Sequence, residues 1–121
     1  MKEDGWDESD AVPIEGLTFE TIEGVALRLR DSKTFTARMN REAELDALWT
    51  LADIASNGMR SAQWMGAAFP PLQSLPRATA DDFATLSELI FRAHDLNADE
   101  RADEAADVLI EAAQLTKDLA R

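Results

Sequence analysis

A run of carboxylates near the C-terminus is the stretch of this chain whose residue types and spacing could do chemistry. Residues 95–113 read DLNADERADEAADVLIEAA and hold seven carboxylates and one arginine. Asp95, Asn97 and Asp99 match the opening of an EF-hand loop, in which alternating oxygens surround a calcium ion. The sixth position of that loop should be a glycine but is Glu100, and the twelfth should be a glutamate but is an alanine. We therefore expect no EF-hand and no bound metal.

Other signatures of catalysis and of cofactor binding are missing from the sequence. The chain has no cysteine and a single histidine, His94, which excludes zinc sites built on histidine and cysteine pairs. The serines lie in no nucleophile-elbow or S-x-x-K context, and the scattered glycines form no GxxxxGK phosphate loop. No Glu-x-x-His pair of a di-metal carboxylate bundle is present. The sequence therefore predicts a protein that is not an enzyme and needs no cofactor.

The acidic run needs a helix to position it, and the C-terminal apolar pattern predicts two helices. Thr79 begins the first with a T-x-x-D pattern close to a capping box, and Leu96-Asn97 should end it. The second is expected over about 98–120, because its alanines and leucines recur at helical spacing. The short link between them predicts an antiparallel C-terminal hairpin.

Two segments precede this hairpin. Asn40 is a good N-cap for a long helix whose apolar residues recur three and four apart and widen beyond one stripe, which predicts a central element. The prolines of FPPLQSLPR should end that helix. Residues 17–39 admit two readings. One is a helix capped by Thr18, and the other is a β-hairpin at 25–39, suggested by alternating apolar residues.

The predicted fold is mainly α, a small bundle of three to four helices with a long central helix and the C-terminal hairpin. The alternative is an α+β fold with the N-terminal β-hairpin. Residues 17–121 should form a single helical domain, as expected for a chain of 121 residues. Residues 1–16 are acidic and poor in large apolar groups, so we expect a flexible acidic arm.

Charge restricts the class of partner. The chain has 24 acidic and 12 basic residues and a net charge of -12, which repels nucleic acid and anionic membranes. No apolar run approaches the length that spans a membrane, and the acidic amino end does not resemble a secretory signal. We therefore expect a cytoplasmic protein that contacts neither nucleic acid nor membrane directly and whose partner is a basic protein.

The most concrete function is that of an inhibitor or regulator that occupies a basic surface of another protein. On a continuous helix, carboxylates at these spacings would form two rows that imitate a phosphate backbone and suit a groove made for DNA. Like charges four residues apart disfavour a helix, which gives some support to a functional role for them. The other interpretation, which stays open, is that they are only the solvated face of an amphipathic helix. The candidate residues are Asp99, Glu100, Asp103, Glu104, Asp107 and Glu111.

The alternative function is a homodimeric structural or regulatory module without charge mimicry. Trp64 belongs to a cluster of tryptophan, methionine and phenylalanine, residue types that are enriched where proteins meet. The five basic residues within 28–41 are expected to pair with the acidic helix, either of the same chain or of a second copy. Trp64 is therefore a further candidate for partner binding.

Overall fold

The protein is described here from a computed structural model, which describes residues 12, 14, 16–59, 75 and 78–120. The ordered elements of these residues are α-helices, and no strand occurs among them. The helices are α1 (Phe19–Asp31), α2 (Phe35–Met59), α4 (Ala80–Ala98) and α5 (Ala102–Leu119). These described residues form an all-α four-helix bundle, so the predicted fold class is confirmed and the α+β alternative is wrong.

Helix α1 covers most of the segment that admitted two readings. The Thr18 side chain accepts a hydrogen bond from the Thr21 backbone amide at 3.1 Å, which satisfies one of the free donors at the beginning of the helix. Ile22 and Leu29 lie on the buried face of the helix. In a strand Val25, Leu27 and Leu29 would share one face. Here Val25 and Leu29 are buried and Leu27 is exposed, as a helix places them.

Helix α2 begins earlier than expected, at Phe35 rather than after Asn40, which lies inside the helix. Thr34 explains the earlier beginning, since its hydroxyl accepts a hydrogen bond from the Ala37 amide at 3.0 Å. The last residues expected in this helix, and the proline segment after it, lie largely outside the described residues.

Helix α4 begins with the capping box that the T-x-x-D pattern predicted. The Thr79 hydroxyl accepts from the Asp82 amide at 3.2 Å, and the Asp82 carboxylate accepts from the Thr79 amide at 2.8 Å. Residues 99–101 then connect α4 to α5, so the expected C-terminal hairpin is confirmed.

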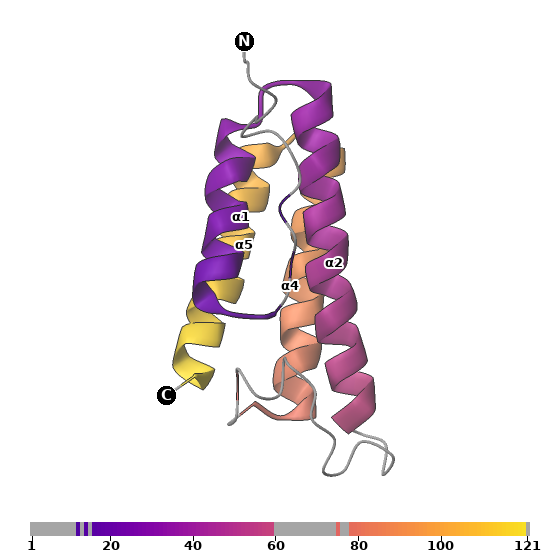
Figure 1. Cartoon of the computed structure of the whole chain (residues 1–121), viewed down its shortest axis with the longest axis vertical. Helices are drawn as coiled ribbons and strands as arrows, with labels where there is room; N and C mark the ends of the chain where they lie inside the picture. Colours follow the sequence, from indigo (N-terminus) through magenta and orange to yellow (C-terminus); the bar gives the residue numbers. More distant parts are fainter. Residues whose placement is uncertain (1–11, 13, 15, 60–74, 76–77, 121) are drawn as a thin grey trace.

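The four helices pack antiparallel in two pairs, α1 with α5 and α2 with α4, as Figure 1 shows. At one end of the bundle Arg30 of α1 pairs with Asp107 of α5, and at the other end the Lys117 ammonium lies 5.2 Å from the centre of the Phe19 ring. The Ser56 hydroxyl of α2 donates to the Ala80 carbonyl oxygen at the beginning of α4. Helices α4 and α5 also pack closely, whereas α1 and α2 contact each other less extensively.

One continuous hydrophobic core lies between these helices. Helix α5 buries mainly alanine against its neighbours, which lets the helices approach closely, and α2 and α4 supply larger groups. The fully buried large apolar side chains include Leu17, Ile22, Leu29, Leu45, Leu48, Phe83, Leu86, Ile90 and Leu109.

A charged cluster lies at the seam between α1 and α2. The Glu44 carboxylate is fully buried and accepts hydrogen bonds from Arg28 at 3.1 Å and from Arg41 at 2.8 Å. The Val12 backbone amide donates to the same carboxylate at 2.7 Å, and Ile14 packs against the core nearby. Val12 and Ile14 belong to the segment expected to be an arm, so its end contacts the bundle; residues 1–11 lie outside the described part of the chain.

Candidate protein-binding surfaces

The predicted acidic residues fall on two structural elements rather than one helix. Glu104, Asp107 and Glu111 lie on α5 together with Asp103, and all four are exposed. Asp99 and Glu100 are also exposed but lie in the turn between α4 and α5. The expectation that one helix would carry all six from residue 98 is therefore wrong. Trp64 lies outside the described residues.

The turn forms because residues 96–101 make a Schellman motif. The Arg101 amide donates to the Leu96 carbonyl oxygen at 2.8 Å, and the Glu100 amide donates to that of Asn97 at 3.0 Å. Glu100 adopts the left-handed conformation with φ of 63°, a position that usually holds glycine. The sequence placed a helix end at Leu96-Asn97 and began the next helix at about residue 98. The absence of glycine from this stretch explains why it did not show that the turn extends to Arg101.

Replacing Glu100 with glycine should raise the free energy of unfolding by up to about 1 kcal/mol, because glycine adopts this conformation without steric cost. The measurement is urea unfolding followed by circular dichroism. The matched control is Glu111→Gly within α5, where the same replacement should lower stability by about 1 kcal/mol. A loss of stability in both variants would show that Glu100 is not strained.

The chain's own arginines neutralise two of the six carboxylates. Arg30 of α1 contacts Asp107 at 2.6 Å, and Arg101 pairs with Glu104. The first contact confirms the expected pairing of the basic segment with the acidic helix of the same chain for Arg30. Arg28 and Arg41 of that segment pair instead with Glu44 of α2. The hydrogen bond from Arg101 lowers the pKa of Glu104 below its ordinary value.

The other four acidic residues keep their negative charge turned to solvent. Asp99, Glu100, Asp103 and Glu111 form no ion pair with any residue that the structure describes. We call these four residues the acidic surface. They lie on the turn and along α5, where a partner can approach them without first breaking an internal salt bridge.

The calcium reading also fails in three dimensions. The Asn97 side chain is buried and donates a hydrogen bond to the Arg38 carbonyl oxygen at 3.1 Å, so it ties α4 to α2 and does not face solvent. Among the described residues no group of three or more histidine or acidic side chains could hold a metal ion. No helix in the described ranges is long and apolar enough to cross a membrane.

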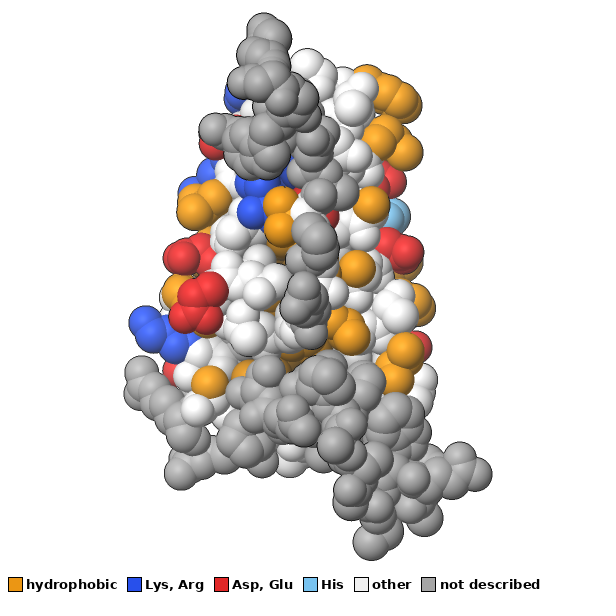
Figure 2. Space-filling view, viewed as in Figure 1, with side chains coloured by type: hydrophobic (Ala, Val, Ile, Leu, Met, Phe, Trp, Pro, Cys, Tyr) orange, Lys and Arg blue, Asp and Glu red, His pale blue; other side chains and the backbone are white. Residues whose placement is uncertain are grey.

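Sequence reasoning missed a second surface, which lies on α2 and α4. Figure 2 shows hydrophobic and acidic side chains, with the histidine among them, along the right-hand edge of the bundle. Phe35 and Met39 are 70% and 48% exposed, and Phe91 of α4 is 53% exposed. The signal was present in α2, where apolar and acidic residues repeat at steps of four and three outside the buried stripe: Phe35, Met39, Glu42, Asp46, Trp49 and Asp53.

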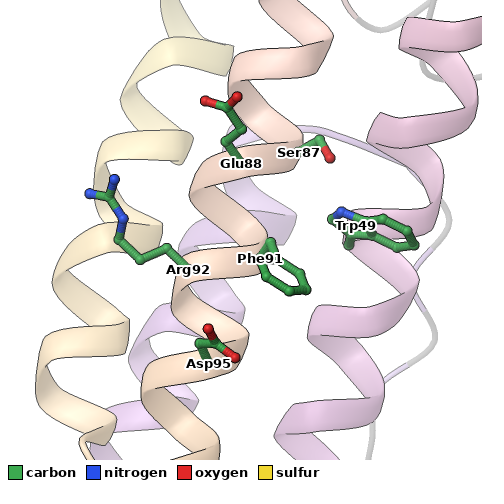
Figure 3. Close-up of a pocket in the computed structure, with 6 residues that line it drawn as sticks. All are labelled: Trp49, Ser87, Glu88, Phe91, Arg92 and Asp95. Atoms are coloured by element: carbon green, nitrogen blue, oxygen red, sulfur yellow. The ribbon is translucent and has the colours of Figure 1, made fainter.

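Trp49 and Phe91 meet across the groove between α2 and α4, with ring centres 6.5 Å apart and planes inclined by 50°. A hollow of about 540 Å³ opens beside them, lined also by Ser87, Glu88, Arg92 and Asp95. Figure 3 shows the two rings reaching toward each other from their helices. His94 lies nearby, with its Nε2 3.7 Å from a carboxylate oxygen of Glu42 on the facing helix.

Comparisons of the chain with protein-family models, with curated proteins and with solved structures found no match.

Proposed function

We propose that this protein is a small acidic binding module that occupies a basic surface of another protein and acts as an inhibitor or regulator. The observation that carries the proposal is the acidic surface, whose four carboxylates are exposed and form no ion pair with the described part of the chain. A partner rich in lysine and arginine would gain charge-assisted hydrogen bonds there without competition from internal pairs.

The internal salt bridges reduce the number of carboxylates that are available to a partner protein. Asp107 is engaged by Arg30 and Glu104 by Arg101, so these two carboxylates contribute less to an incoming partner. The continuous row of charge expected from a single helix is replaced by a cluster around the turn and the exposed side of α5. This arrangement suits a compact basic patch better than a long groove that follows a nucleic-acid backbone.

The test uses charge reversal with a matched control. One variant carries Glu100→Lys and Asp103→Lys. The control carries Glu20→Lys and Asp31→Lys, which are exposed residues of α1 and not of the turn or α5. The two variants have the same net charge. Each is used beside the unmodified protein to capture partners from the native cell, and the affinity for the captured protein is then measured at several salt concentrations.

The first variant should lose affinity on the order of tenfold or more, because each reversal replaces attraction with repulsion. The control should retain the partner, and binding by the unmodified protein should weaken as salt is added. Equal losses in both variants would show that only overall charge matters. Unchanged affinity in the first variant would exclude the acidic surface as the site.

A further inference from the structure

The face formed by α2 and α4 carries the exposed apolar side chains of Phe35, Met39 and Phe91 beside the partly buried Trp49. Phe35, Met39 and Trp49 follow one another along the outer side of α2, with Phe91 opposite on α4. The rise of a helix places Phe35 and Trp49 about 21 Å apart along α2. Exposed aromatic and methionine side chains in a row of this length are typical of a surface that receives another helix.

Acidic side chains flank these apolar groups. Glu42, Asp46 and Asp53 share the outer stripe of α2, and Glu88 and Asp95 line the hollow on α4 beside the single arginine, Arg92. Figure 3 places Glu88 and Asp95 on either side of Phe91 along α4. The face therefore carries apolar and acidic side chains interleaved along α2, with Phe91 between Glu88 and Asp95 on α4.

We propose that this α2–α4 face binds a basic amphipathic helix of another protein. The apolar side of such a helix would cover Met39, Trp49 and Phe91, and its lysines and arginines would meet the flanking carboxylates. A second copy of this chain fits less well, because it would bring its own carboxylates against those of the first. The face shares no residue with the acidic surface of the proposed function, so each can be tested with the other intact.

The test uses a defined probe, a synthetic helical peptide of about four turns in which leucines share one face and lysines the other. Two further peptides serve as controls, one with the same residues in scrambled order and one with glutamate in place of lysine. Binding is measured by titration calorimetry and mapped by the NMR amide signals of the isotope-labelled protein. The signals that shift should belong to α2 and α4, and both control peptides should bind at least tenfold more weakly.

Protein variants identify the side chains responsible. Phe91→Ala and Met39→Ala should each weaken binding of the amphipathic peptide on the order of tenfold, because exposed anchors of this kind dominate interface energies. Leu27→Ala removes an exposed apolar group from α1 and is the matched control, which should leave the affinity within about threefold. Thermal unfolding establishes that all three variants keep the fold.

Several outcomes would overturn the proposal. Shifts confined to the acidic surface, equal binding of the scrambled peptide, or unchanged affinity in Phe91→Ala would each do so. The state of association is measured by sedimentation of the protein alone. A dimer that Phe91→Ala dissociates would mean that a second copy occupies the face. If the charge-reversed variant of the acidic surface binds the peptide normally, the two surfaces act separately.

Discussion

Replacing Glu44 with glutamine is expected to lower the free energy of unfolding by about 3–5 kcal/mol, the usual cost of breaking a buried ion pair from one side. The carboxylate joins Arg28 and Arg41 and also accepts from the Val12 amide. Glutamine keeps the volume but removes the negative charge. The Arg41 side chain is 1% exposed, so its guanidinium would lose its charged partner Glu44 away from water.

Urea unfolding followed by circular dichroism measures this effect. The control is Glu20→Gln, an exposed carboxylate on α1 whose replacement should change stability by less than about 0.5 kcal/mol. A double variant, Arg41→Met with Glu44→Met, should recover much of the loss, because apolar groups of similar size can replace a buried ion pair at little cost. A Glu44→Gln variant as stable as the unmodified protein would show that the cluster is not buried as described.

Replacing Phe83 with alanine should cost about 3–5 kcal/mol of the free energy of unfolding, because the ring is fully buried in the core between the helices. Removing the ring loses the free energy gained when it is transferred out of water. It also leaves a cavity that the neighbouring helices fill only in part. A net stability of about 5–15 kcal/mol is usual for a domain, so this single change takes a large fraction of it.

Phe91→Ala is the matched control, since it removes the same side chain two turns further along α4 from an exposed position. Its cost should stay below about 1 kcal/mol. Chemical unfolding of the two variants side by side gives the comparison. Similar losses would mean that Phe91 is covered in the free protein, which would also weaken the case for an accessible α2–α4 face.

The ends of the helices show how far local sequence reasoning reaches. The capping box of Thr79 and the Thr18 cap could be predicted from the sequence, because a capping residue and its hydrogen-bond partner lie within one turn of each other. The beginning of α5 could not be predicted in this way, because Glu100 adopts the left-handed backbone conformation that glycine usually adopts. Asn40 led to a wrong prediction for the beginning of α2. It is a residue type suited to capping, but Thr34 caps this helix and Asn40 lies inside it.

The buried charges show which contacts cannot be predicted from local sequence patterns. Arg41 and Glu44 continue the inward stripe of Leu45 and Leu48 toward the beginning of α2, which is a local signal that charges are buried there. The partner in α1, Arg28, could not be assigned from spacing, because it depends on which faces of the two helices meet. The same holds for Arg30 and Asp107, which are 77 residues apart in the chain and pair across the bundle.

The order of the apolar residues by itself determined that α2, α4 and α5 are helices and that the last two form a hairpin, because helical periodicity and caps act over a few residues. It left residues 17–39 open between a helix and a β-hairpin, which the structure decided. Only the tertiary structure decided which carboxylates remain available and which apolar side chains stay uncovered. Asp107 is engaged because α1 packs against α5, and Trp49 and Phe91 form one face because α2 packs against α4. Those pairings depend on contacts between distant segments, which no local pattern specifies.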